Sequence, residues 1–509
     1  MGIRSTLAKP FAAYIARQTR EWSGRAEVYQ ENIRRTILQQ AAATRFGTEH
    51  GFADIRNQDD FRRQVPVKDY EQLKPWFDAV ASGSPDVLWP GKPAYLAKTS
   101  GTTSGTKYIP ITRDSIPNHI NSARNALLNY VHETGNSGFL DGNLIFLSGS
   151  PELEEKGGIP TGRLSGIVNH HVPAYLRTNQ KPTYATNIIE DWEAKLDRII
   201  DETLDARMTL ISGIPPWVQM YFDKIRSRTG KKIKDIFPDF SVFVHGGVNF
   251  SPYRTKLEES IGHSVDSIEL YPASEGFIAY QDRQRQEGLL LLANSGIYFE
   301  FIPAEEYFNE HPRRLSLGEV ELGKNYALII NSNAGLWGYS IGDTVKFVSR
   351  DPYRLVVTGR VKHFLSAFGE HVIGEEVEQA MREACRRFPE TAVTEFTVAP
   401  QVTPAEGLPH HEWLIAFDRI PSDMNAFRLA LDAELRNLNT YYDDLITGNI
   451  LRTLVITPLK TDAFISHMKT QGKLGGQNKV PRLSNDRKIA DALHTHRTII
   501  DHNTEQLGK

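Results

Sequence analysis

The spacing of the apolar runs is the feature that most constrains how this 509-residue chain can fold. A helical pattern covers residues 25–46. Strand candidates follow it, alternating with helical stretches, at 144–147, 208–211, 241–244 and 267–270. The pattern then changes to short β runs separated by turns, at 296–302, 318–322, 326–330, 344–348 and 354–358. Beyond residue 360, strands alternate again with helices expected near 374–387 and 422–438.

These patterns predict an α/β (α+β) fold with a large N-terminal domain of mixed sheets, which includes a β-barrel-like part, and a smaller α+β domain. We place the boundary near Gly359 and Arg360, so the predicted domains are residues 1–359 and 360–509. The sequence contains no repeats or low-complexity tracts, which excludes a solenoid.

Composition excludes several classes of protein. With 40% hydrophobic and 24% charged residues the chain is typical of a globular protein, and no run reaches the roughly 18 apolar residues that a spanning helix needs. The net charge of -3 provides no global basic field, so we expect a small-molecule partner and neither nucleic acid nor a membrane. The single cysteine, Cys385, excludes a disulfide framework and favours a reducing cytoplasm.

A hydroxyl-rich loop follows a predicted strand at residues 98–107, Lys-Thr-Ser-Gly-Thr-Thr-Ser-Gly-Thr-Lys. Glycines let the backbone approach a ligand, hydroxyl and amide groups donate to phosphate oxygens, and the ammonium of Lys107 offsets their charge. Only three residues separate Gly101 from Gly105, so this is not a Walker loop. The composition suits a polyphosphate site or, alternatively, a polar surface turn. The candidate residues are Thr99, Ser100, Gly101, Thr102, Thr103, Ser104 and Lys107.

Two further motifs follow predicted strands, at residues 244–249 (Val-His-Gly-Gly-Val-Asn) and 269–276 (Glu-Leu-Tyr-Pro-Ala-Ser-Glu-Gly). Open α/β sheets bind ligands beyond the carboxyl ends of their strands. Tyr271 offers a flat face for a purine, and Glu275 offers a hard oxygen ligand for Mg²⁺. The alternative is a turn with a helix-capping serine and an exposed glutamate. The candidate nucleotide-binding residues here are Gly246, Gly247, Tyr271, Ala273 and Ser274.

A third motif, residues 338–343 (Gly-Tyr-Ser-Ile-Gly-Asp), has two interpretations. Gly338 to Gly342 fits Gly-x-Ser-x-Gly, in which Ser340 would be the nucleophile of an α/β hydrolase. That interpretation requires a helix to follow, whereas the chain continues as Thr-Val-Lys-Phe-Val-Ser, a β pattern. We therefore expect a tight glycine turn in which Asp343 accepts hydrogen bonds from two ribose hydroxyls.

In this order, the motifs resemble those of the adenylate-forming superfamily, which includes acyl-CoA synthetases and luciferases. The closer resemblance is to the auxin-responsive Gretchen Hagen family of acyl acid amido synthetases, and the chain length is similar to that of its bacterial members. The segments that carry the resemblance are 60–70, 98–107, 271–275, 339–343, 357–362, 368–372, 438–442 and 475–482. Ser340 departs from it, since the family often has an arginine after the aromatic residue, and Pro272 replaces a small residue.

The resemblance implies an ATP- and Mg²⁺-dependent enzyme whose smaller domain is mobile. It places the ATP phosphates on loop 99–107, the adenine on Tyr271, Mg²⁺ on Glu275 and the ribose on Asp343. It also places Arg360 and Lys362 at the hinge, with Arg360 among the nucleotide-binding residues. Lys479 would reach the acyl carboxylate and the α-phosphate, so the implied catalytic residues are Lys107, Lys479 and Glu275.

The implied reaction converts a carboxylic acid into acyl-AMP and then into an amide. Two alternatives are an adenylating ligase that delivers the acyl group to a thiol such as coenzyme A, and a non-catalytic nucleotide-binding protein. Residues 162–177 align loosely with the family's acid-binding segment, where apolar side chains would suit an apolar acid. The candidate acyl-binding residues are Leu164, Ile167, Val168 and His171. The adjacent His170 and His171 are alternatively polar positions at a helix end, and they form a poor metal site.

Overall fold

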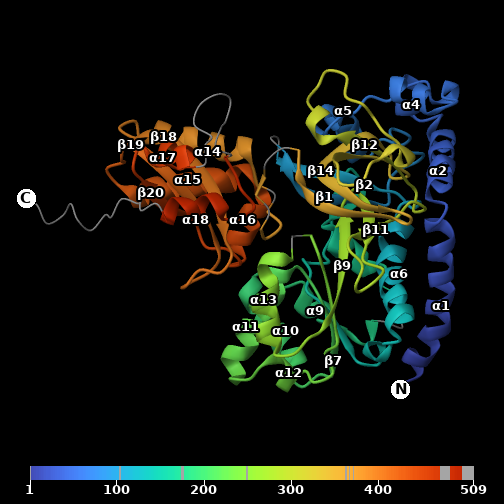
Figure 1. Ribbon diagram of the computed structural model, residues 1–509, viewed down its shortest axis with the longest axis horizontal. Helices are drawn as coiled ribbons and strands as arrows, with labels where there is room; N and C mark the ends of the chain where they lie inside the picture. Colours follow the sequence, from blue (N-terminus) through green and yellow to red (C-terminus); the bar gives the residue numbers. More distant parts are fainter. Residues whose placement is uncertain are drawn as a thin grey trace, which may run out of the picture. The chain divides into compact units, whose positions relative to one another are not determined.

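The computed structural model describes residues 2–102, 105–172, 177–247, 250–361, 364–365, 367–370, 372–470 and 482–495 (Figure 1). The chain divides into two compact units. The first consists of Met1–Thr99 and Lys107–Val361, and the second of Ser100–Thr106 and Lys362–Lys509. Each unit has its own sheets and is described by itself.

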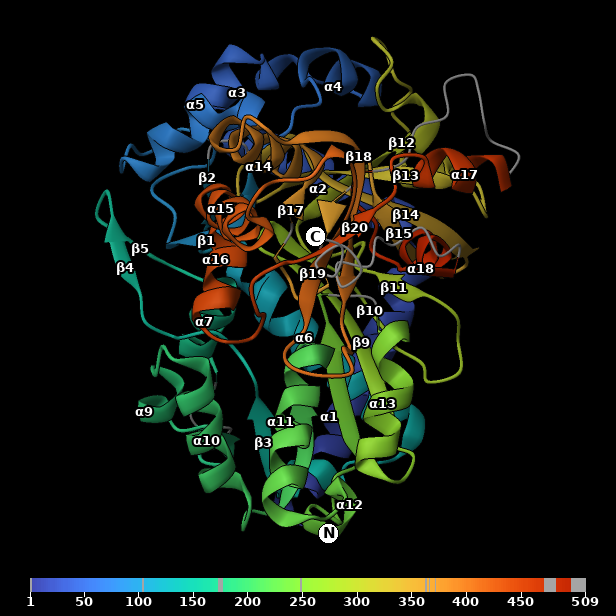
Figure 2. The same cartoon turned by 90° about the vertical axis from the view of Figure 1, so that its left-hand side faces the viewer.

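One large mixed sheet forms the centre of the first unit (Figure 2). In spatial order its strands are β12 (Ile297–Pro303), β13 (Asn325–Ser332), β14 (Leu336–Arg350), β15 (Tyr353–Arg360), β11 (Leu289–Leu291), β10 (Gly276–Tyr280), β9 (Asp266–Ala273), β8 (Val242–Gly246), β7 (Met208–Ser212), β3 (Asn143–Phe146) and β6 (Gln180–Lys181). From β12 to β9 neighbouring strands are antiparallel, and from β9 to β6 they are parallel. The central parallel strands β7 and β8 are buried along almost their whole length because helices cover both of their faces.

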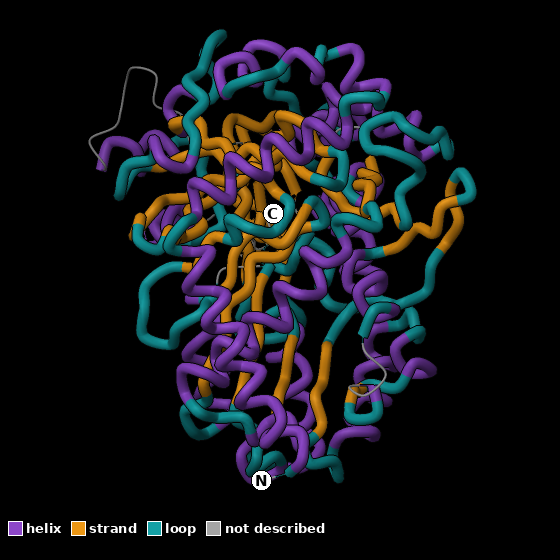
Figure 3. The backbone as a smooth tube through the Cα atoms, turned by 90° about the vertical axis from the view of Figure 1, so that its right-hand side faces the viewer, coloured by secondary structure: helices purple, strands orange, loops and turns teal. Residues whose placement is uncertain are grey.

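Helices cover the two faces of the parallel half. On one face α6 (Ile116–Thr134) packs on β9 and β10, and α1 (Ile3–Ser23) packs on α6. This is the side seen in Figure 3, where helices lie in front of the strands. The opposite face carries α10 (Trp192–Thr203), α11 (Pro215–Thr229) and α13 (Ser251–Ile261), which lie in front of the strands in Figure 2. The carboxyl ends of β8 and β9 therefore emerge between two helical layers.

A second sheet of the first unit has the order β2 (Gly105–Ile111), β1 (Tyr95–Thr102), β5 (Ile159–Gly162) and β4 (Glu154–Lys156). The segment 98–107, expected as a loop, instead lies largely in these strands, since β1 includes residues 98–102 and β2 includes residues 105–107. The remaining helices of this unit are α2 (Ala26–Ala41), α3 (Arg45–Glu49), α4 (Gln58–Gln64), α5 (Tyr70–Ala81), α7 (Leu164–His170), α9 (Tyr184–Asn187) and α12 (Ile233–Ile236). Asn57 and Asp69 fix the starts of α4 and α5, because each forms a reciprocal capping box with the residue three positions later.

The second unit is a small α+β structure. Its strands are β18 (Ala392–Gln401), β19 (His410–Arg419) and β20 (Val455–Leu459) in one sheet, and β16 (Phe364–Leu365) and β17 (Val372–Ile373) in another. Its helices are α14 (Gly374–Arg387), α15 (Met424–Leu438), α16 (Thr440–Thr447), α17 (Ala463–Thr470) and α18 (Lys488–Thr495). Strands β18 and β19 are antiparallel, and β20 pairs with β19 in parallel. The adjacent residues Trp413 and Leu414 of β19 are both buried.

The α/β fold class and the smaller second unit are as the sequence predicts, and three local expectations are wrong. The β-barrel-like part is the antiparallel half of the large sheet, whose described strands run in an open order from β12 to β6. The helix expected over 25–46 ends at Ala41, because the Thr44 side chain accepts from Gly47 N and starts α3. The run 318–322 forms no strand; Leu317–Glu319 is a 3₁₀ turn closed by Ser316 and Glu319.

Candidate active site

The segment around residues 57–70 attaches to the strand that carries the third motif. Lys68 N donates to the carbonyl oxygen of Gly338 at 2.9 Å, and Ser340 N donates to that of Lys68 at 2.9 Å. Gly338 has a φ of +55°, and a Cβ at this position would lie 2.3 Å from the carbonyl oxygen of Pro66. Glycine is therefore required here both by conformation and by close packing.

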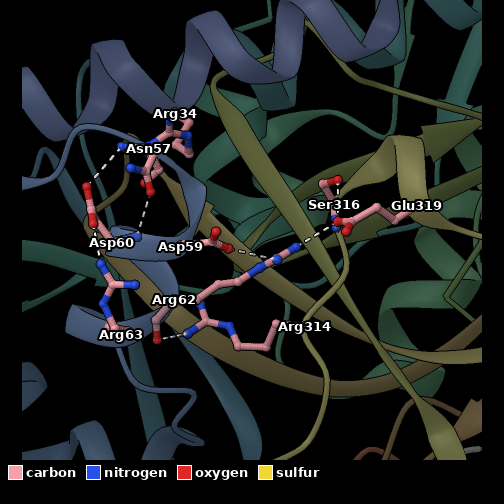
Figure 4. Close-up of polar contacts among 9 residues, drawn as sticks. All are labelled: Arg34, Asn57, Asp59, Asp60, Arg62, Arg63, Arg314, Ser316 and Glu319. Carbon is pink, nitrogen blue, oxygen red and sulfur yellow. Dashed lines mark hydrogen bonds and ion pairs between the residues drawn. The ribbon is translucent and has the colours of Figure 1, made fainter.

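Figure 4 shows the polar contacts that hold this segment. Arg62 Nη2 lies 2.7 Å from Glu319 Oε2, and Glu319 Oε2 also accepts from Ser316 N at 2.7 Å. Arg314 Nη1 donates to the carbonyl oxygen of Arg62 at 3.1 Å, and Arg34 Nη1 donates to that of Asn57 at 3.1 Å. The two arginines thus bind backbone carbonyls at the two ends of α4.

A buried ion pair continues this network toward Gly338. Arg314 pairs with Glu300, whose side chain is 0% exposed. Asn331 Nδ2 donates to Glu300 Oε2 at 3.1 Å, and Asn331 Oδ1 accepts from Gly338 N at 2.6 Å. The charges of Arg314 and Glu300 therefore compensate each other in the interior, and their network fixes the first residues of the third motif.

The second and third motifs meet through hydrogen bonds between side chains. Tyr271, at the end of β9, donates through its hydroxyl to Asp343 Oδ2 at 2.6 Å. Tyr339 donates through its hydroxyl to Glu275 Oε1 at 3.2 Å, and its buried ring packs edge-on against Phe77 at 6.0 Å. Residues expected to hold the adenine, the ribose and the metal are thus brought together, although the hydrogen-bonded partners are 72 and 64 residues apart in the sequence.

The third motif is not a tight turn, so that expectation is wrong. Residues 338–343 lie within β14, and the strand continues to Arg350 with Gly342 at a φ of +83°. Ser340 is buried, and its Oγ accepts from the Tyr307 hydroxyl at 2.8 Å. A nucleophile elbow needs an exposed serine followed by a helix, so the hydrolase interpretation fails. Asp343 lies opposite Arg360 in the β14–β15 ladder.

Lys107 lies beside the aromatic group of the first segment. Its Nζ is 5.5 Å from the centroid of the Tyr70 ring, which stacks on Phe77 at 4.8 Å. The Tyr70 hydroxyl accepts from Tyr108 N at 3.0 Å, and burial raises the pKa of Tyr70 to about 12. The ammonium of Lys107 thus forms a cation–π contact with a neutral aromatic ring.

Several predicted site residues fall where side chains are not described. Ser100, Gly101 and Thr102 end strand β1, and Arg360 ends β15, but nothing is stated of their side chains. Thr103, Ser104 and Lys479 lie outside the described residues. Their roles stay predictions.

The glycines of the second motif are not equivalent. A Cβ on Gly246 would lie 2.3 Å from the carbonyl oxygen of Leu270, so close packing of β8 on β9 already requires glycine there. Gly247 has a φ of +81°, and among the described residues a Cβ would meet Ile214 alone, at 3.9 Å. Of the two, Gly247 is the residue that leaves open space at the carboxyl end of β8. Ala273 ends β9, and Ser274 and Glu275 form the turn into β10.

The candidate acyl-binding residues lie on and just after α7. Ile167 is buried in the core, and Leu164 and Val168 are half-buried. The His171 ring meets that of Tyr95 edge-on at 5.5 Å, and burial lowers the pKa of His171. The neighbouring His170 instead contacts the carbonyl oxygen of Pro151 through Nε2 at 2.7 Å. The two histidines thus contact different groups, as adjacent helical positions predict.

Comparison with known proteins identifies the family. The sequence model of the GH3 family N-terminal domain matches residues 16–181 and 164–265, that of the GH3 family central domain matches 290–360, and that of the GH3 family C-terminal domain matches 375–488. The chain belongs to the GH3 family.

Named GH3 relatives are amido synthetases. The chain is 22% identical to indole-3-acetic acid-amido synthetase GH3.3 of Arabidopsis thaliana, over 93% of this chain and 92% of that protein. It is 23% identical to jasmonoyl–L-amino acid synthetase JAR4 of Nicotiana attenuata, over 62% of this chain and 66% of that protein.

Solved structures share the fold. The AtGH3.15 acyl acid amido synthetase in complex with 2,4-DB has a TM-score of 0.60 at 16% identity, covering 96% of both chains. A 2-hydroxyisobutyryl-CoA ligase in its thioesterification state has a TM-score of 0.57 at 12% identity, covering 93% of this chain and 92% of that one. These likenesses show that this GH3 chain shares the fold of both enzymes.

Three residues of this GH3 chain were given no role by the sequence. Tyr70 and Tyr339 belong to recognised segments, but only the fold shows that they contact Lys107 and Glu275. Lys195 carried no signal at all. It is buried, its Nζ donates to the carbonyl oxygens of Ser148 and Asn187 at 3.0 and 2.7 Å, and burial lowers its pKa to about 8.

The described residues contain neither a cluster of metal-ligating side chains nor a helix that could span a membrane. Across the described ranges, no three His, Cys, Asp or Glu side chains are grouped as a metal site. Among the same residues, none of the helices has the length and apolar character needed to cross a membrane.

Proposed function

We propose that this GH3-family chain is an ATP-dependent acyl acid amido synthetase. It is a ligase that activates a carboxylic acid as acyl-AMP with release of pyrophosphate, and then transfers the acyl group to an amine or amino acid to give an amide and AMP. The observation that carries the proposal is the pair of hydrogen bonds Tyr271–Asp343 and Tyr339–Glu275. These bonds join residues expected at the base, the ribose and the metal.

The nucleotide end of the site is built on three strands. Tyr271 orients the Asp343 carboxylate through Oδ2, which prepares that carboxylate to accept hydrogen bonds from the vicinal ribose hydroxyls. Gly247 leaves the space beside β8 that a base needs. The loop at 99–107 supplies glycine, hydroxyl and amide groups for the phosphates, as a polyphosphate requires.

Adenylation brings two anions together. A carboxylate oxygen attacks the α-phosphorus, the bond to pyrophosphate breaks, and negative charge develops on the leaving group. Lys107 and Lys479 would offset this charge, and electrostatic effects of this kind contribute several kcal/mol, on the order of 3, to a transition state. Glu275 would hold Mg²⁺, which neutralises phosphate charge when bound. Its Oε1 already accepts from Tyr339, which fixes the carboxylate in place.

Amide formation needs a different arrangement of the same site. The amine attacks the acyl carbonyl carbon, AMP leaves, and the amine loses a proton. We assign residues 1–359 to nucleotide and acid binding and residues 360–509 to a mobile domain whose rotation withdraws Lys479 after the first step. The assignment is supported by the central family model, which ends at 360, and by the division of the compact units between Val361 and Lys362.

We propose an apolar carboxylic acid as the substrate, an amine or amino acid as the acceptor, and a cytoplasmic location. Leu164 and Val168 on α7 would offer an apolar wall, and His171 a polar edge, to an apolar acid. A cytoplasmic location is supported by the lone Cys385, a half-buried free thiol whose pKa burial raises. Such a thiol is poorly reactive and needs no oxidising compartment.

The experiment that tests the proposal is a screen of carboxylic acids for pyrophosphate release with Mg-ATP. Each active acid is then tested for product with amino acids, with simple amines and with coenzyme A as acceptors. Amide products are expected. Thioester as the preferred product would replace the amido synthetase by an acyl-CoA ligase, and the absence of pyrophosphate release with every acid would support a non-catalytic nucleotide-binding protein.

Variants of Asp343 and Ser340 distinguish ATP-dependent adenylation from hydrolysis by a serine nucleophile. Asp343→Ala should weaken ATP use by about 30- to 1000-fold in kcat/KM, since a carboxylate that accepts two hydroxyls is worth roughly 2–4 kcal/mol. Among the described contacts, Ser340→Ala removes the hydrogen bond from the Tyr307 hydroxyl, and it should keep most activity. ATP dependence of amide formation in both variants is the measurement. ATP-independent ester cleavage that disappears in Ser340→Ala would contradict adenylation.

A further inference from the structure

Helix α1 has two apolar faces, and only one of them is used by the fold. The inner face packs on α6 and buries Ala12, Ile15, Ala16 and Trp22. The outer face lies on the outside of the first unit, with α6 between α1 and the sheet (Figure 1). An amphipathic helix in a globular protein normally exposes polar residues there.

The outer face instead carries four large apolar side chains, which we call the α1 stripe. Ile3 is 81% exposed, Leu7 66%, Phe11 43% and Tyr14 55%. The spacings of four, four and three residues place all of them along one side of the helix. Phe11 and Tyr14 are stacked with ring centroids 6.4 Å apart. Scattered exposed apolar residues are ordinary, but a continuous row marks an interaction surface.

Basic residues border the α1 stripe. The sequence of α1 contains Arg4, Lys9, Arg17 and Arg20, and Glu21 is its single acidic residue. At 100° per residue, Arg4 and Arg17 flank the stripe on opposite sides, whereas Lys9 and Arg20 fall on the far side of the helix and Glu21 falls in line with the stripe. Arg124 of α6 adds a further guanidinium, 5.6 Å from the centroid of the Phe11 ring. The net charge of -3 for the whole chain conceals this local basic border.

We propose that the α1 stripe docks the protein onto an anionic lipid surface. Apolar side chains would enter the headgroup region of the bilayer while the flanking arginines contact lipid phosphates or carboxylates, as in helices that lie in a membrane interface. A second copy of the chain is a poorer occupant, because two α1 stripes facing each other would bring their basic borders together with one acidic residue each to balance them. The proposal is independent of the proposed enzymatic function.

The test is co-sedimentation with phospholipid vesicles. The wild-type protein should bind vesicles of phosphatidylcholine that contain about 30% phosphatidylserine, and bind pure phosphatidylcholine vesicles at least about 10-fold more weakly. Raising NaCl from about 50 to 300 mM should release it, because salt screens the basic border. The double variant Leu7→Glu/Phe11→Glu should lose at least about 10-fold in binding.

A matched control separates the α1 stripe from a general effect of charge. Leu429 and Ile465 are 47% and 49% exposed and lie on α15 and α17. The double variant Leu429→Glu/Ile465→Glu adds the same charge and should bind like the wild type. Unchanged thermal unfolding of both variants verifies folding. Arg17→Glu should weaken binding to anionic vesicles only.

Three outcomes would overturn the proposal. The first is no binding to anionic vesicles, and the second is equal loss of binding in the stripe variant and its control. The third is a dimer in analytical ultracentrifugation that Leu7→Glu/Phe11→Glu dissociates, since a second copy would then be the occupant. Pyrophosphate release without vesicles should be the same in all these variants.

Discussion

Arg314→Met should lower the free energy of unfolding of the first unit by about 3–5 kcal/mol, because it leaves a buried carboxylate without its cation. Glu300 is fully buried, and Asn331 would be its one remaining partner among the described contacts. The loss also removes the donor to the carbonyl oxygens of Arg62 and Val65. Denaturant unfolding followed by tryptophan fluorescence measures the change, since Trp337 lies in the same core.

The neighbouring residue is the control. Arg313 pairs with Glu306 at the surface, where its side chain is 64% exposed, so Arg313→Met should cost at most about 1 kcal/mol. Adding Glu300→Leu to Arg314→Met should recover part of the loss, because no unpaired charge then remains inside. Equal effects of Arg313→Met and Arg314→Met would show that the buried pair does not hold this region.

Arg314→Met has a second expected consequence for the site. Asn331 connects Glu300 to Gly338 N, and Tyr339 follows directly with its contact to Glu275. Loosening the network should therefore raise the KM for ATP even where the protein remains folded. This connection runs from the segment in Figure 4 to the third motif.

The hydrophobic pattern predicted those helices and strands whose formation depends mainly on residues near them in the sequence. The buried runs at 208–211 and 241–244 became β7 and β8, and the amphipathic pattern at 374–387 became α14. The run 318–322 failed because its alternation of glutamate and apolar residues imitates a strand. There the Glu319 side chain returns to Ser316 N at 2.7 Å and closes a turn, a contact that periodicity does not report.

The sequence pattern did not predict which distant strands are neighbours in the sheet. The antiparallel runs suggested a barrel, whereas β11 lies between β15 and β10 and joins them to the parallel half. Likewise, the motifs located Tyr271 and Asp343, but their hydrogen bond depends on how β14 and β9 are placed in the sheet. The sequence identified Gly246 as a residue that lets a nucleotide approach the backbone. The structure adds a second reason for glycine there, because the Leu270 carbonyl oxygen lies too close for a Cβ.

Lys479→Ala should reduce formation of acyl-AMP by about 100- to 1000-fold, as expected for removal of one group that stabilises transition-state charge. Lys479 lies outside the described residues, and its role rests on the segment Gln-Asn-Lys-Val-Pro-Arg at 477–482. Acid-dependent pyrophosphate release measures the first step. Amide formation from preformed acyl-AMP measures the second step and should be much less affected.

The two assays together distinguish a catalytic lysine from a structural one. Lys488, also in the second unit, is 87% exposed and pairs only weakly with Asp486 at 3.2 Å, so Lys488→Ala should leave both steps unchanged. A structural role for Lys479 would lower both steps together, because a misfolded second unit serves neither. If amide formation from preformed acyl-AMP falls as far as the complete reaction, the assignment of Lys479 to adenylation is wrong.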